Sequence, residues 1–220
     1  MFLHGYLSSS KSFAYQLGYF ARDFIVYAPD FKGFGENLGM EKPYSLDDYV
    51  DELVGFLEKN GIEKPCVVAH SFGARVAIKA CVRYPNLFDK LVITGGAGLK
   101  PRNTIKKVVK KLAFNFLKLF VPKSKLKGFY SPDYLALDPV MKESFKLVVR
   151  EHLDSSLHLV NLPTLIVFGD KDKQTPLYMA KRFHKSIKGS KLLIFKGAGH
   201  FCFIDCPGKF NMEVREFLLS

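Results

Sequence analysis

The sequence predicts an α/β fold in which a mostly parallel central sheet of about six strands is flanked by helices. Short apolar runs that end in small or turn-forming residues alternate with segments of helical period, as in parallel strands joined by right-handed crossover helices. The 220 residues suit one domain with a modest insertion and can bury roughly 70% of the surface of the unfolded chain. The apolar fraction of 48% excludes the disordered, collagenous and disulfide-scaffold classes.

The apolar runs and the helical periods assign the elements in chain order. Strands are predicted at Phe2–Leu3, Phe24–Ala28, Cys66–Ala69, Leu91–Thr94, Thr164–Phe168 and Leu192–Phe195. Helices are predicted at Ser12–Ala21, Ser45–Asn60, Ser71–Tyr84, Pro176–Ile187 and Pro207–Leu219. Ser45, with Asp48 three residues later, is typical of an N-terminal cap on an amphipathic helix. These elements place the core domain at residues 1–98 and 163–220.

Residues 99–162 interrupt the alternation and are predicted to form a helical lid inserted between two strands. They contain no strand-like run, only helical periodicity punctuated by prolines. Apolar side chains fall on one helix face, at Ile105, Val108, Val109, Leu112, Phe116 and Phe120, and lysines fall mostly on the other. Such a helix can pack on the core domain, which is the favoured interpretation, or lie on an anionic surface.

The net charge of +12 is concentrated in this insertion. Residues 100–128 contain ten Lys or Arg and no acidic residue, which leaves +2 for the rest of the chain. A basic insertion on a nearly neutral core does not indicate nucleic-acid binding. The lysines are instead compatible with weak contact to an anionic head group or lipid surface.

Residues 67–77 place a serine where an apolar strand runs directly into a helix, in the sequence VVAHSFGARVA. Ala69 and Gly73 lie two residues before and after Ser71, where a sharp turn would bring other backbone close. The stretch resembles the nucleophile elbow of the α/β-hydrolase family, G-x-S-x-G, with Ala69 in place of the first glycine. The resemblance implies that Ser71 is the nucleophile.

Two further motifs resemble the partners of that serine. His200, in KGAGHF at residues 196–201, is similar to the family's catalytic histidine, and a neutral imidazole can exchange the serine proton. Residues 165–176, LIVFGDKDKQTP, contain two candidate acids. Family spacing favours Asp172 over Asp170, which would cap the turn. The chain order Ser71, Asp172, His200 is the one this fold implies.

The segment LHGY at residues 3–6 resembles the family's oxyanion loop. That resemblance implies an oxyanion hole formed by the backbone N–H groups of Tyr6 and Phe72. One departure concerns the start of the chain, because the family usually has two further strands before this loop. The sheet is therefore expected to lack them, and its exposed edge to need a cover such as a partner subunit in a homo-oligomer.

Each motif alone has a structural explanation: a helix cap for Ser71, a turn histidine for His200, a solvated charge for Asp172. Four motifs in the implied order, each at the carboxyl end of a predicted strand, favour catalysis. The resemblance then implies a serine hydrolase that cleaves a carboxylic ester or related acyl bond through an acyl-enzyme, with no cofactor and no metal. Aromatic lid residues indicate a largely apolar small substrate (Phe114, Phe116, Phe120, Phe129, Tyr130 and Tyr134).

Two alternatives to the esterase remain open at this point. A carbon–carbon bond hydrolase uses the same triad, and a non-catalytic ligand-binding or membrane-associated protein could share the fold. The first ten residues have no basic segment and only a two-residue apolar run, which predicts no secretory signal and a cytoplasmic protein. The four cysteines lack paired zinc-site spacing and are expected to be reduced.

Overall fold

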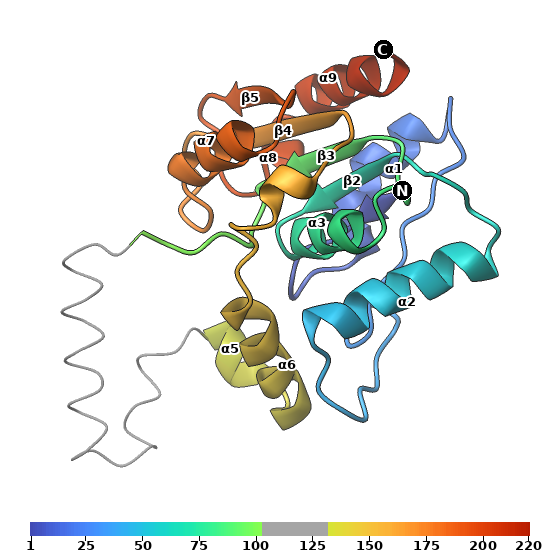
Figure 1. Cartoon of the computed structure of the whole chain (residues 1–220), viewed down its shortest axis with the longest axis vertical. Helices are drawn as coiled ribbons and strands as arrows, with labels where there is room; N and C mark the ends of the chain where they lie inside the picture. Colours follow the sequence, from blue (N-terminus) through green and yellow to red (C-terminus); the bar gives the residue numbers. More distant parts are fainter. Residues whose placement is uncertain (103–131) are drawn as a thin grey trace.

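The computed structural model describes residues 1–102 and 132–220, and its centre is a parallel sheet of five strands (Figure 1). The strands lie in the order of the chain: β1 (Phe2–Leu3), β2 (Val67–His70), β3 (Leu91–Thr94), β4 (Thr164–Gly169) and β5 (Lys191–Phe195). Phe2 pairs with Val68, Val68 with Val92, and Val92 with Leu165. The carboxyl ends of all five strands therefore meet at one edge, where open α/β sheets bind their ligands.

The alternation of side chains along the strands divides the core into two layers. One layer packs Leu3, Ala69 and Ile93 beneath helices α2 (Leu46–Lys59), α3 (Phe72–Arg83) and α7 (Leu177–Ser186). The other packs Phe2, Val68 and Val92 beneath α1 (Ala14–Phe20), α8 (Cys202–Asp205) and α9 (Pro207–Leu219). Both faces of the sheet are thus covered by helices, as a parallel sheet requires.

Apart from the strand at Phe24–Ala28, the predicted elements of the core domain are recovered within a few residues, and the local signals explain their ends. Ser45 caps α2 in a capping box: Asp48 N–H donates to Ser45 Oγ at 3.2 Å, and Ser45 N–H donates to Asp48 Oδ2 at 2.8 Å. The predicted helix at Ser12–Ala21 is split into a 3₁₀ turn, η1 (Ser10–Phe13), followed by α1. The short helix α8 has no counterpart in the prediction.

The prediction of a strand at Phe24–Ala28 was wrong, so the described residues contain five strands rather than about six. This segment lies beside β1, where Phe2 N–H donates to Tyr27 O at 2.8 Å. The two residues of β1 form their ladder with β2, and no second backbone hydrogen bond joins β1 to residues 24–28. Ile25 within the segment is 83% exposed, so the segment lies on the surface at the edge of the sheet.

Between β3 and β4 the structure describes three short elements of the predicted lid: α5 (Pro132–Ala136), α6 (Pro139–Arg150) and the 3₁₀ turn η3 (Leu157–Leu159). Helices α5 and α6 lie together, apart from the sheet (Figure 1). Asp138 caps α6 by accepting a hydrogen bond from Met141 N–H at 2.9 Å. The predicted amphipathic helix and most of the lysine-rich segment fall in residues 103–131, outside the described residues. The domain boundary at residues 99–162 stays a prediction.

Candidate active site

The backbone at Ser71 makes the sharp turn that the sequence predicts between β2 and α3. Ser71 has φ of +49° and ψ of −104°, a conformation that is costly for a residue with a side chain. Its N–H donates to Thr94 O at 3.1 Å, and its carbonyl accepts from Ala97 N–H at 3.2 Å. These bonds to the last residue of β3 and to the loop after it hold the turn at the carboxyl edge of the sheet.

Glycines allow the turn to touch the loop that follows β1. A Cβ on Gly73 would lie 2.4 Å from Leu3 O, and Gly73 N–H donates to His4 O at 3.0 Å. A Cβ on Gly5 would lie 2.8 Å from His70 Nδ1. Since no larger residue fits either place without displacing its neighbours, the predicted nucleophile and the predicted oxyanion loop are packed directly against each other.

The predicted acid and base are in contact. His200 Nδ1 lies 2.8 Å from Asp172 Oδ2, and both side chains are buried, with exposed fractions of 6% and 0%. Asp172 Oδ1 also accepts hydrogen bonds from the backbone N–H groups of Gln174 (2.8 Å) and Thr175 (2.9 Å). Burial opposes ionisation of Asp172, but the hydrogen bonds from His200 and Thr175 outweigh it and hold its pKa below the ordinary value.

The competing acid, Asp170, has a different role. Its Oδ1 accepts a hydrogen bond from Gly197 N–H at 2.7 Å, which closes the loop after β4 onto the loop that leads to His200. Asp170 therefore joins two loops by a hydrogen bond rather than capping its own turn as the sequence suggested, and Asp172 is the carboxylate placed against the imidazole.

Ser71 and His200 line the same cavity. Ser71 Oγ makes no hydrogen bond to any residue that the structure describes, so the serine–histidine contact is not formed here. Such contacts are often long in the absence of substrate and tighten when it binds. Because Asp172 engages Nδ1, Nε2 is the nitrogen of His200 that remains available for another partner.

The predicted oxyanion residues, Tyr6 and Phe72, also line this cavity on either side of the elbow. Their rings pack edge to face with centroids 5.4 Å apart. The loop that carries Tyr6 is held by His4, whose Nδ1 lies 2.8 Å from Gly5 O and whose Nε2 accepts from Phe31 N–H at 3.0 Å. Burial lowers the pKa of His4, which favours the neutral ring that this pair of contacts requires.

Three residues outside the predicted site pack around the acid and base, and sequence reasoning missed two of them, Thr175 and Gly95. Thr175 Oγ1 donates to Asp172 Oδ2 at 2.7 Å and lies 3.2 Å from His200 Nδ1. A Cβ on Gly95 (φ +52°) would lie 2.9 Å from His200 O. His70, whose Nε2 lies 3.2 Å from His200 O, is fully buried, and this burial lowers its pKa to about 3. Of the missed residues, only Thr175 had a feature in the sequence that could have indicated it, because it lies three residues after Asp172.

The cavity has a volume of about 310 Å³ and a mixed lining. Aromatic and aliphatic side chains from the elbow, from α6 and from the loop after His200 form its apolar walls (Phe72, Phe145, Val148, Val149 and Phe201). Arg75, Gln174 and Thr175 supply polar groups. Tyr6 connects the oxyanion loop to the lid, because its hydroxyl donates to Met141 O at 3.1 Å. The walls therefore come from both the core domain and the predicted lid.

The aromatic lid residues that were predicted to contact substrate are only partly described. Phe114, Phe116, Phe120, Phe129 and Tyr130 lie outside the described residues. Tyr134 lies in α5, and its ring packs against Phe145 with centroids 5.5 Å apart. Through Phe145, this one ring of the predicted set is in contact with the cavity wall.

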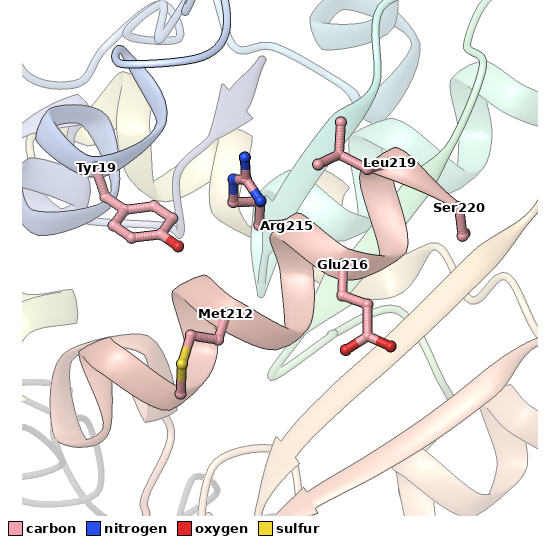
Figure 2. Close-up of a pocket in the computed structure, with 6 residues that line it drawn as sticks. All are labelled: Tyr19, Met212, Arg215, Glu216, Leu219 and Ser220. Carbon is pink, nitrogen blue, oxygen red and sulfur yellow. The ribbon is translucent and has the colours of Figure 1, made fainter.

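A second hollow, of about 420 Å³, lies between α1 and α9 and is lined by Tyr19, Met212, Arg215, Glu216, Leu219 and Ser220 (Figure 2). None of the predicted site residues reaches it. Within residues 1–102 and 132–220, no group of three His, Cys, Asp or Glu side chains could hold a metal ion. No helix in those same ranges is long and apolar enough to cross a membrane.

Comparisons with known proteins cover nearly the whole chain. A family model described as "Alpha/beta hydrolase family" matches residues 1–213. An uncharacterized protein of Mycobacterium tuberculosis is 26% identical over 99% of this chain and 74% of its own length. A 2-hydroxymuconate semialdehyde hydrolase of Pseudomonas is 25% identical over 88% of this chain and 76% of its own. An esterase from Exiguobacterium antarcticum has a similar structure, with a TM-score of 0.79, 24% identity, and coverage of 100% and 91%.

Proposed function

The chain belongs to the alpha/beta hydrolase family, and from that premise we propose that it is a serine hydrolase that cleaves a carboxylic ester of a largely apolar small substrate. The observation that carries the proposal is the hydrogen-bonded pair of His200 and Asp172, buried at one cavity with a serine in a strained turn. Strained backbone at a cavity wall is characteristic of functional residues.

The proposed reaction has two acyl-transfer steps. His200 Nε2 takes the Ser71 proton as Oγ attacks the carbonyl carbon, and the alcohol leaves with that proton to give an acyl-enzyme. Water then attacks the acyl carbon, again losing its proton to His200, and the acid is released as Ser71 is reprotonated. Asp172 keeps Nδ1 protonated and stabilises the imidazolium.

The remaining parts of the cavity fit this reaction. The backbone N–H groups of Tyr6 and Phe72 would stabilise the oxyanion, and losing one such donor typically costs about 3 kcal/mol of transition-state stabilisation. Apolar walls from α6 (Phe145, Val148 and Val149) support an apolar acyl or alcohol group, and they give the predicted lid a part in substrate selection.

A fluorophosphonate probe, which forms a covalent bond with an activated serine, tests the proposal. We expect labelling of the intact chain, turnover of p-nitrophenyl esters, and loss of both in Ser71→Ala. Ser186→Ala, at the end of α7 and away from the cavity, is the matched control and should behave as the parent chain. An unlabelled chain, or Ser71→Ala that still turns over esters, would contradict the proposal and favour a binding protein of the same fold.

A carbon–carbon bond hydrolase is the second candidate, because the same triad would serve it and one relative is named 2-hydroxymuconate semialdehyde hydrolase. Probe labelling does not separate the two. Rapid turnover of p-nitrophenyl esters favours the esterase, whereas slow ester turnover combined with cleavage of a vinylogous 1,5-diketone acid favours the carbon–carbon hydrolase.

A further inference from the structure

Arg75 is a buried cation in the wall of the active-site cavity that the proposed mechanism does not use. It lies four residues after Ser71, in the first turn of α3, which begins at Phe72. Only 8% of the residue is exposed, and it lines the cavity together with Ser71 and His200. Burying a guanidinium is costly unless its charge and its donors are compensated.

Only part of the guanidinium is compensated by the protein. Nη1 donates to two carbonyls at the end of α6, Val148 O at 2.8 Å and Glu151 O at 2.6 Å. Nε and Nη2 donate to no residue that the structure describes. These two nitrogens form one edge of the planar group, and that edge matches the two oxygens of a carboxylate.

The charge of Arg75 is also unpaired within residues 1–102 and 132–220. The two carboxylates near it are already held by other cations: Glu151 by Lys79, at 2.6 Å, and Asp154 by Arg182. No carboxylate oxygen in those ranges comes within 4 Å of the guanidinium. Burial lowers the pKa of Arg75 to about 10, so the group keeps its proton at neutral pH.

We propose that the substrate carries a carboxylate at the far end of its acyl group, and that this carboxylate binds the Nε–Nη2 edge of Arg75 while the ester carbonyl lies at Ser71. The inference rests on the proposed serine hydrolase. The acyl group stays bonded to Ser71 until the second step. Arg75, on the helix that begins directly after Ser71, would therefore hold the carboxylate end of the acyl group through both steps. The apolar walls of α6 would contact the methylene chain between the two ends.

Two esters with the same six-carbon acyl chain test the proposal: p-nitrophenyl hexanoate, which ends in a methyl group, and mono-p-nitrophenyl adipate, which ends in a carboxylate. We expect the intact chain to prefer the adipate by about tenfold to a hundredfold in kcat/KM, the range of a charge-assisted hydrogen-bonded pair. Arg75→Met keeps the apolar stem and removes the edge, and the ratio should fall to about one. Arg75→Lys keeps the charge without the edge and should give an intermediate ratio.

The matched control is Arg83→Met. Arg83 is a cation two turns further along α3 that pairs with Asp47 and Asp51 and does not line the cavity, so the adipate-to-hexanoate ratio should stay within about twofold of the parent value. Because the readout is a ratio, a general loss of activity in a destabilised variant does not affect it.

The outcomes separate this inference from the proposed function. Serine-dependent turnover of the hexanoate with no preference for the adipate overturns the carboxylate site and leaves the serine hydrolase standing. An equal fall of the ratio in Arg83→Met and Arg75→Met also overturns it, because the preference would then come from the overall positive charge of the protein and not from one side chain. Failure to turn over either ester, with no probe labelling, contradicts the proposed function itself.

Discussion

Replacing Gly73 with alanine tests the close contact between the elbow and the loop after β1. The added Cβ would lie 2.4 Å from Leu3 O and 2.8 Å from His4 O, both backbone atoms that cannot rotate away. Ordinary contact needs about 3.5 Å, so helix α3 and the loop must separate by about 1 Å. The two amides proposed to bind the oxyanion, on Tyr6 and Phe72, lie on opposite sides of this contact.

A displacement of about 1 Å typically costs about a hundredfold in rate when it moves catalytic groups. We therefore expect Gly73→Ala to lose about a hundredfold in kcat/KM for a p-nitrophenyl ester, with labelling by the fluorophosphonate slowed in parallel. Overpacking should also lower the free energy of unfolding by about 1–3 kcal/mol, measured by urea titration.

Gly55→Ala is the matched control, because Gly55 lies in helix α2 with no atom near the position of an added Cβ. There alanine should stabilise the chain by up to about 1 kcal/mol and leave turnover unchanged. Gly73→Ala with the kcat/KM and stability of the parent chain would refute the reasoning, since the two backbones could not then be in contact as described.

Two further predictions concern the buried acid and its neighbour. Thr175→Val removes the hydroxyl 2.7 Å from Asp172 Oδ2, and it should lower the free energy of unfolding in urea titrations by about 1–3 kcal/mol and also lower kcat/KM. Thr175→Ser keeps the hydroxyl and should retain most of the stability and of kcat/KM. Equal losses in the two variants would argue against the hydrogen bond. Asp172→Asn should lower kcat/KM by about 10⁴-fold. The folded-state pKa of Asp172 is depressed, so its stabilisation is present above the unfolded pKa of about 3.9 and lost as the pH falls through the folded value. Acid titrations followed by circular dichroism should show a weaker dependence on pH in Asp172→Asn, and identical dependence in both chains would contradict this assignment.

The sequence was informative where a local pattern decides the structure. The apolar run before Ser71 and the small residues around it predict the strand, the turn and the helix without knowledge of distant residues. The capping box of Ser45 and Asp48 likewise depends on a spacing of three. The spacing that favoured Asp172 over Asp170 agrees with the contact between Asp172 and His200.

Features that depend on contacts between residues far apart in the sequence were not predictable in this way. Residues 24–28 have the apolar composition of a strand, but a strand needs a partner, and a single backbone hydrogen bond joins this segment to β1. Arg75 reads as a polar position on α3, and only the approach of α6 and of the chain around Gly98 buries it. Gly95 appears as a turn glycine until His200 is placed against it.

The division of the core into two hydrophobic layers affects which measurement detects partial unfolding first. Ser71 and Asp172 adjoin helices of one layer, α3 and α7, whereas His200 leads into α8 of the other. The proposed mechanism therefore requires both layers to be intact at the same moment, although either could loosen while the other retains its helices. Enzyme activity should consequently decline at milder heat or denaturant than the helical signal does, which makes turnover the more sensitive gauge of partial unfolding.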